Sequence, residues 1–155
     1  MTSIYEGLAN ELKFKLGLKK IKFDEMFRLI NNQKYEEIKK IVDDENIQTL
    51  IDDIVTERKK IGNELEKKLN DLIWLNERLL QFGEEPQLSK TQALKLLKTF
   101  VFINIYDLHS ELYEKRTTKK LLKKQLRKHP ETRYPLHCAK ENETLKCFLI
   151  KIKIK

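Results

Sequence analysis

Apolar residues recur at spacings of three, four and seven over the stretch from Ile47 to Phe82, which is the spacing of one face of a helix. The pattern therefore predicts a single long amphipathic helix over 47–82. Gly62 interrupts it near the middle, where a glycine costs about 1 kcal/mol relative to alanine. The apolar positions are Leu50, Ile54, Ile61, Leu65, Leu69, Leu72, Ile73, Leu79 and Leu80.

The stretch from Ser89 to Lys128 carries the longest uninterrupted helical pattern in the chain. Ser89 and Gln92 form a capping box, in which each side chain satisfies a backbone N–H at a helix start. His129-Pro130 closes the stretch, because proline disfavours helix in the residue before it. One side of this helix is expected to be buried and holds Leu97, Val101, Leu108, Leu112, Leu122 and Leu126. A second side changes from aromatic to cationic along Phe102, Tyr106, His109, Tyr113, Arg116, Lys120, Lys124 and Arg127.

A short connection, Gly83 to Pro86, joins the two stretches, so they are expected to lie as antiparallel neighbours. Shorter helices toward the N-terminus are expected to pack along this pair, the first of them opened by a capping box at Ser3 and Glu6. We therefore predict a mainly α protein, a helical bundle built around a long antiparallel helical hairpin. The heptad-like spacing also permits a coiled-coil homodimer, and the sequence alone leaves the oligomeric state open.

The residues after Pro130 follow a different pattern. From Ile150 to Lys155 isoleucine alternates with lysine, which is the period of a half-buried strand. We predict a short C-terminal β-hairpin with strands over 134–139 and 144–155. A lone hairpin is marginally stable, so it must pack on the helices, join another sheet or move freely.

Composition agrees with a helical protein. Of the 155 residues 36% are charged, and only four are glycine and three proline, which disfavours a turn-rich β fold. The longest apolar runs are too short to span a bilayer, and the N-terminus lacks the pattern of a secretion signal. A soluble intracellular protein, cytoplasmic or nuclear, is therefore expected. Its predicted parts are a helical domain, residues 1–128, and a basic C-terminal appendage, residues 129–155.

Positive charge is concentrated toward the C-terminus. Residues 115–155 hold 14 lysines and arginines against three acids, a net charge of about +11, whereas the other 114 residues sum to about −3. Such segregation suggests a polyanionic partner. Cations spaced by four residues can contact successive phosphates, and tyrosines can stack on unpaired bases. We predict a non-enzymatic nucleic-acid-binding protein that uses the basic tail and a site of Lys115, Arg116, Lys119, Lys120, Lys123, Lys124, Arg127, Lys128, Tyr106 and Tyr113.

The same residues leave other functions open. An acidic protein partner or plain solvation also accounts for the basic helix end. The alternative function is an assembly subunit or adaptor of a larger complex, docking through the apolar helix stripes. An anionic membrane surface is disfavoured, because the leucines belong to the buried stripe and no Trp or Phe flanks the basic run.

Residue types suited to zinc occur near the C-terminus, but their spacing is not that of a zinc site. His129, His137, Cys138 and Cys147 include neither a C-x2-C pair nor an H-x3-H pair, and two reduced thiols are expected instead. No glycine-rich phosphate loop, nucleophile elbow or H-E-x-x-H motif is present. We therefore expect no metal, no cofactor and no enzymatic activity.

Two stretches resemble known families. Tyr134-Pro-Leu-His-Cys-Ala139 resembles the T-P-L-H-x-A signature of an ankyrin repeat, which implies that Leu145 to Ile150 is a helix. The match covers about 17 residues, less than one repeat, and a single repeat cannot bury its own face, so no ankyrin fold is predicted. In outline alone the chain resembles a GINS replication subunit, with Leu88-Ser89 opening a late helix before a small β tail. That resemblance implies a replication- or chromosome-related complex for the alternative function.

Overall fold

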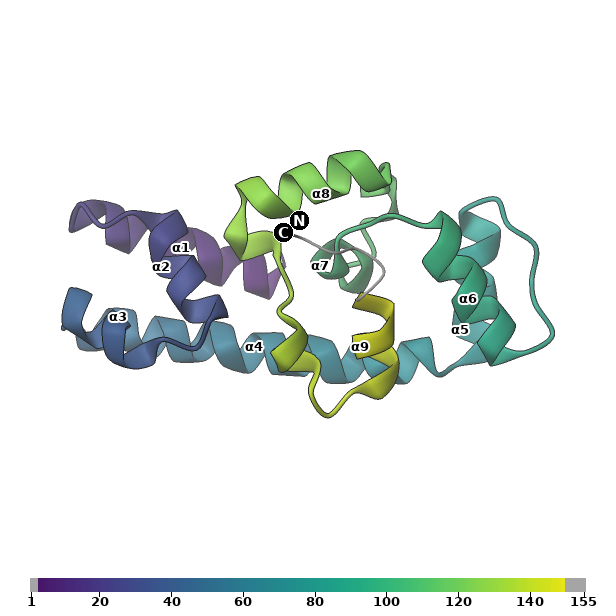
Figure 1. Cartoon of the computed structure of the whole chain (residues 1–155), viewed down its shortest axis with the longest axis horizontal. Helices are drawn as coiled ribbons and strands as arrows, with labels where there is room; N and C mark the ends of the chain where they lie inside the picture. Colours follow the sequence, from purple (N-terminus) through teal and green to yellow (C-terminus); the bar gives the residue numbers. More distant parts are fainter. Residues whose placement is uncertain (1–2, 150–155) are drawn as a thin grey trace.

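The structure, a computed structural model, describes residues 3–149 and is mainly helical. One long helix, α4, runs through most of the length of the molecule, and the other helices lie against it or beyond its end (Figure 1). Within residues 3–149 the only β pairing is an isolated bridge between Phe102 and Thr117. The helices are α1 Ile4–Leu18, α2 Phe23–Asn31, α3 Tyr35–Ile41, α4 Glu45–Leu69, α5 Leu72–Gln81, α6 Lys90–Phe100, α7 Ile105–His109, η1 Tyr113–Lys115, α8 Lys119–Lys128, η2 Pro130–Thr132, η3 Leu136–Ala139 and α9 Glu143–Leu149.

The two ends of α4 are determined by a cap at its start and by the cap of the next helix just beyond its end. Asp44 begins the helix by accepting two backbone hydrogen bonds on its carboxylate, as N-cap residues do. The helix ends at Leu69, because Asp71 caps α5 in the same way. The prediction of one helix over 47–82 is therefore wrong at this break. The apolar stripe of α4 is buried within the chain, against α1 on one side and the C-terminal segment on the other.

The predicted antiparallel hairpin is not present. α5 and α6 lie side by side, but their starts are together, since Lys90 of α6 donates to the side chain of Asn70 at 2.9 Å. Their ends are also together, because the guanidinium of Arg116 donates to the carbonyls of Phe82 and Phe100, each at 2.9 Å. The two helices therefore run in the same direction, and the connection between them returns along α5 (Figure 1).

The second predicted helix, 89–128, is divided into α6, α7 and α8. α6 begins at the predicted cap, Ser89, and ends at Phe100. The chain then leaves the helical conformation until Asn104, which caps α7. Val101 and Ile103 in this link are buried, and their β-branched side chains favour extended backbone. The continuity was predicted wrongly, yet four members of the predicted apolar stripe are buried: Leu97, Val101, Leu108 and Leu122.

The segment after Pro130 packs on α4 as helical turns where a β-hairpin was predicted. α9 takes the place of the second strand over Glu143–Leu149. Its start is held by Glu66 of α4, whose carboxylate accepts from the backbone N–H groups of Thr144 (3.0 Å) and Leu145 (2.7 Å). The predicted strand residues 150–155 lie outside the described part of the chain. This segment shares the core of α4 through Tyr134, Ala139, Leu145 and Phe148, so it is built into the helical body.

Gly62 lies where this segment crosses α4. A Cβ atom at Gly62 would stand 2.1 Å from the hydroxyl oxygen of Tyr134, which donates to the carbonyl of Arg58 at 3.1 Å. We expect Gly62→Ala to lower the free energy of unfolding by about 1–2 kcal/mol in urea denaturation, because the overpacking outweighs the gain in helix propensity.

Gly7 in α1 provides the matched control, because a Cβ atom added there has no neighbour within 4 Å. Gly7→Ala is expected to stabilise the protein by up to about 1 kcal/mol, since alanine restricts the unfolded chain and favours helix. If Gly62→Ala stabilised the protein as Gly7→Ala does, the close approach of Tyr134 to α4 would be disproved.

Candidate nucleic-acid interface

α8 lies along the upper edge of the molecule in the view of Figure 1. The hydroxyl of Thr118 accepts the backbone N–H of Leu121 and caps the helix. Leu122 is its one fully buried residue. At the other end, Arg133 donates to the carbonyls of Leu126 and Arg127, which have no partner within the helix. Both ends of α8 are therefore fixed, while most of its surface faces outward.

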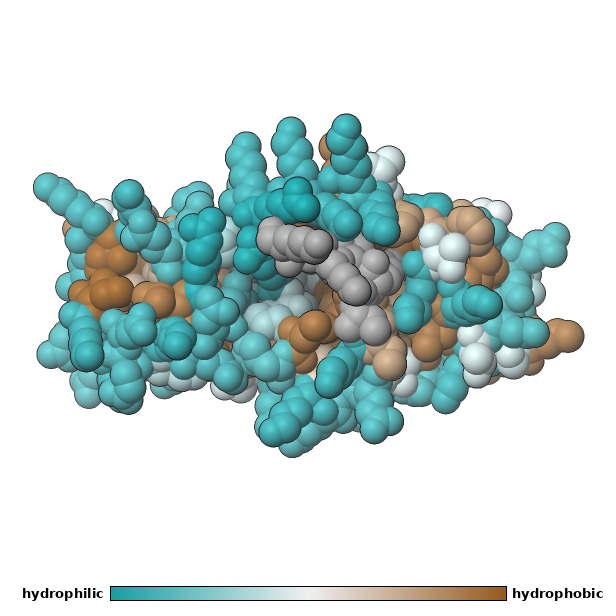
Figure 2. All heavy atoms as spheres, viewed as in Figure 1, coloured by the Kyte–Doolittle hydropathy of each residue, from teal (hydrophilic) through white to brown (hydrophobic). Residues whose placement is uncertain are grey.

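The outward surface of α8 is cationic. No residue of this helix is acidic, and none of its cations forms an ion pair with an acid among residues 3–149. Five of the six are exposed and Lys123 is half-buried. Hydrophilic side chains accordingly project from this edge in Figure 2. We call this set the α8 cations: Lys119, Lys120, Lys123, Lys124, Arg127 and Lys128.

The two predicted cations before α8 have partners inside the molecule. Lys115 lies 3.8 Å from the carboxylate of Asp107, and burial raises the pKa of that carboxyl group. Arg116 joins the ends of α5 and α6 and lies over the ring of Phe82, 5.2 Å from its centroid. Arg116 therefore holds the fold together, and Lys115 is partly neutralised. Neither belongs to the open basic surface.

Tyr106 is withdrawn from the predicted site, because only 7% of it is exposed. Its ring stacks on that of Tyr5 with centroids 4.0 Å apart and planes 4° apart. Its hydroxyl accepts from Nε of Arg58 at 3.1 Å and donates to the carbonyl of Arg133 at 3.2 Å. Burial raises its pKa well above the ordinary value, so the hydroxyl is neutral. A nucleic-acid base cannot reach this ring.

Tyr113 is also engaged within the chain. Its hydroxyl accepts from Nη1 of Arg78 at 2.8 Å, and the same guanidinium lies 4.9 Å from the centre of its ring. The ring of Phe82 meets it edge-on at 5.8 Å. The prediction that Tyr106 and Tyr113 form a stacking surface beside the basic residues is therefore wrong. What is left of the predicted site is the set of α8 cations.

No protein-family model matches the chain, and neither the curated proteins nor the solved structures gave a match. Among residues 3–149 no helix is both long and apolar enough to cross a membrane. In the same part of the chain no three His, Cys, Asp or Glu side chains gather closely enough to hold a metal ion. Cys138 and Cys147 are free thiols.

Arg58 is the residue that the sequence analysis missed. It is 2% exposed, in the middle of α4. Its Nη2 donates to the hydroxyl of Tyr5 (3.3 Å) and to the amide oxygen of Asn31 (2.6 Å), and its charge lies 5.2 Å from the ring centre of Phe27. A signal was available, because Arg58 stands at a core position of the stripe Ile47, Ile51, Ile54, Arg58, Ile61, Leu65.

Proposed function

We propose that this protein binds nucleic acid through the α8 cations. The observation that carries the proposal is that six cations on a ten-residue helix have no ion-pair partner among residues 3–149. A helix that only needs to stay soluble usually mixes acids with its lysines, and this one does not. A surface of one sign attracts a polyanion and gains affinity when condensed counterions leave the nucleic acid.

The arrangement of the α8 cations suits a phosphate backbone. They form two rows along the helix axis, Lys119, Lys123 and Arg127 in one and Lys120, Lys124 and Lys128 in the other. At 100° per residue the two rows cover about half of the circumference, opposite the buried Leu122. Lysine and arginine side chains reach phosphate oxygens without reading bases. Since the rings of Tyr106 and Tyr113 are engaged within the chain, we propose binding to the backbone with little preference for sequence.

The charge-reversal variant Lys120→Glu, Lys124→Glu, Arg127→Glu tests the proposal. Binding to a short labelled duplex, followed by fluorescence anisotropy, is expected to weaken at least about a hundredfold at low salt, because several phosphate contacts are lost or become repulsive. For the unchanged protein, the logarithm of the affinity should fall with the logarithm of salt concentration with a slope of about −4. Circular dichroism should show that the variant stays folded, since the three side chains are exposed.

The control variant changes three exposed lysines to glutamate and so reverses their charge. They lie on α3 and just before it: Lys34, Lys39 and Lys40. Both triple variants change the net charge by the same amount, so a general effect of charge would weaken binding equally in both. The proposal requires that only the α8 variant lose binding. If the unchanged protein bound neither duplex nor single-stranded oligonucleotides at low ionic strength, the proposal would be abandoned.

A second candidate, an assembly subunit or adaptor, is favoured by a different surface. Three large apolar side chains are exposed around α5 and the connection after it: Leu88 (97%), Ile73 (73%) and Leu80 (60%). Apolar side chains show at that end of the molecule in Figure 2. Exposed apolar groups that gather on one end are typical of protein contacts. A protein held there would still bind the α8 charge-reversal variant, so the same variant separates the two functions.

A further inference from the structure

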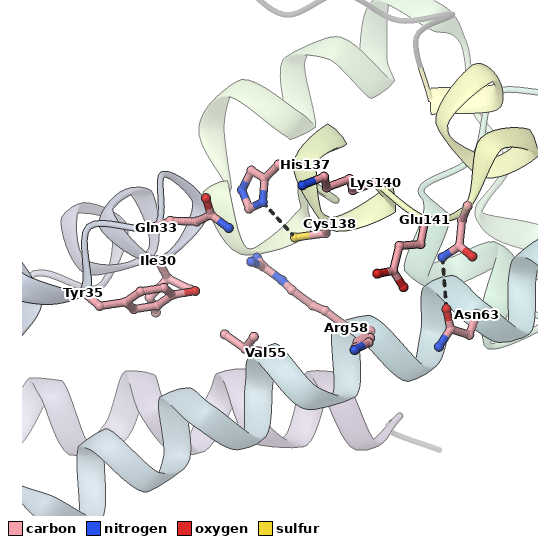
Figure 3. A pocket seen from close by; sticks show the side chains of 12 residues that line it. Ile30, Gln33, Tyr35, Val55, Arg58, Asn63, His137, Cys138, Lys140 and Glu141 are labelled. Atoms are coloured by element: carbon pink, nitrogen blue, oxygen red, sulfur yellow. Dashed lines mark hydrogen bonds between the residues drawn. The ribbon is translucent and has the colours of Figure 1, made fainter.

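A cavity of about 210 Å³ lies beside the middle of α4, between the α2–α3 corner and the C-terminal segment. Figure 3 shows its walls: Tyr35 and Ile30 on the left, Val55 and Arg58 of α4 below, and His137 and Lys140 above. None of the residues that line it belongs to α8. The cavity is therefore separate from the proposed nucleic-acid surface.

The side chain of Arg58 extends from α4 into this region, and its end lies below His137 and Cys138 (Figure 3). Three of its five N–H groups are occupied: Nε–H by Tyr106, and the two of Nη2 by Tyr5 and Asn31. The two N–H groups of Nη1 have no hydrogen-bond acceptor among residues 3–149. Nη1 is not one of the fully enclosed side-chain atoms that lack a partner, so it reaches accessible space and its two donors are available to a ligand.

Among residues 3–149 no acid lies within hydrogen-bond reach of the Arg58 guanidinium. Its partners are the hydroxyls of Tyr5 and Tyr106 and the amide of Asn31, and burial raises the pKa of both tyrosines, which keeps them neutral. A buried cation is normally paired with an anion. In the described part of the chain its hydrogen-bond partners are neutral, and its guanidinium lies near the rings of Tyr5 and Phe27, which leaves a place for a counter-ion.

The rest of the cavity also favours an anion. Lys59 and Lys140 stand in its lining against a single acid, Glu141. The sulfur of Cys138 is hydrogen-bonded with His137 Nδ1 at 3.6 Å (Figure 3), and burial raises the pKa of that thiol. The sulfur is therefore uncharged at neutral pH and does not repel an anion.

From this geometry we propose that the cavity binds a small oxyanion, a phosphate or a carboxylate group, on Nη1 of Arg58. Guanidinium N–H groups form strong charge-assisted hydrogen bonds with such oxygens, and a nearby lysine adds a mobile positive charge. The cavity, at about 210 Å³, admits only a small ligand, since pockets for drug-sized molecules are about 300–1,000 Å³. The bound anion connects α4 with the C-terminal segment and so stabilises the packing of the two.

The test is a titration of the full chain with inorganic phosphate at constant ionic strength, followed by two-dimensional ¹H–¹⁵N NMR, with acetate as a parallel ligand. The proposal predicts saturable shifts of the Arg58 Nε–H signal and of the backbone amides of residues 137–142 with at least one of the two anions. Shifts that do not saturate with either anion, or that centre on α8, would overturn it.

Two single variants show whether the anion binds in the cavity or on α8. Lys140→Glu reverses a charge in the cavity lining and should weaken anion binding about tenfold, because it replaces an attraction with a repulsion. Lys124→Glu makes the same change on α8 and should leave anion binding as it was. Equal affinity in both variants would also overturn the proposal. The experiment does not depend on nucleic-acid binding, since Lys124→Glu affects only that function.

Discussion

Phe148→Ala is expected to lower the free energy of unfolding by about 3–5 kcal/mol, the usual cost of removing a fully buried aromatic side chain. Phe148 is 1% exposed and lies in the core cluster that α9 shares with α4. The loss combines the free energy of transferring the ring from water with the cost of the cavity left behind. Denaturation in urea, monitored by circular dichroism, measures the change, with the slope against urea concentration checked for constancy.

The adjacent residue supplies the control for this prediction. Cys147 is exposed on the same helix, so Cys147→Ala should change the stability by less than about 0.5 kcal/mol. On a strand the two neighbours would face opposite sides, and Lys146 would share the buried side with Phe148. On α9 the buried partner is Leu145, three residues away. A loss below about 1 kcal/mol for Phe148→Ala would contradict the packing of α9 on α4.

The spacing of these residues explains why the tail was predicted as strands. The regular alternation of isoleucine and lysine over 150–155 is the strongest local signal in the tail and indicates a strand. Within 144–149 the apolar residues are Leu145, Cys147, Phe148 and Leu149, whose spacing fits a helix through 145, 148 and 149 and also a strand through 145, 147 and 149. The decisive contact is long-range, because Glu66 supplies the acceptor for the start of α9. A local pattern does not contain that information.

The helix boundaries show what local rules do predict. The caps at Ser3 and Ser89 lie where the sequence placed them, and α8 ends at the residue before His129-Pro130. These signals involve neighbouring residues, so they survive any tertiary arrangement. The direction of α6 relative to α5 is not fixed by neighbouring residues, because the connection between the two helices is long enough to return along α5. Connection length alone could not decide between the two directions.

The prediction of the candidate site was also right where it depended on local sequence and wrong where it depended on tertiary structure. Exposure of the α8 cations follows from the hydrophilic side of one short helix, so the sequence predicted it. The aromatic residues upstream were assigned to the same surface only because one continuous helix was assumed. The breaks at Phe100 and after His109 rotate that surface, so Tyr106 turns into the core against Tyr5. The basic part of the prediction persists, while the stacking part depended on a helix that is not continuous.

Replacing Arg58, the buried cation of the core, is expected to have the second large effect on stability. Arg58→Met is expected to lower the free energy of unfolding by about 3 kcal/mol, because methionine fills similar space but cannot donate the hydrogen bonds that Arg58 makes, each worth about 1.5–3 kcal/mol when the donor is charged. The bonds that are lost are those to Tyr106, Tyr5 and Asn31. Asn31 then keeps a buried amide oxygen without its donor, since its nitrogen is the atom that bonds Pro130.

General rules alone do not decide whether Arg58→Met raises or lowers the free energy of unfolding, so measuring it is informative. Replacing a complete buried ionic cluster by apolar groups is often neutral or stabilising, because the desolvation cost disappears with the charges. Here the neutral partners stay behind, so the gain from removing one buried charge is offset by the acceptors that lose their donor. Lys59→Met, an exposed neighbour on the same helix, removes the same charge and should change stability by less than about 0.5 kcal/mol. An Arg58→Met variant as stable as the Lys59→Met variant would mean that the charge is carried at no net benefit to folding, and that its retention serves only the anion proposed for the cavity.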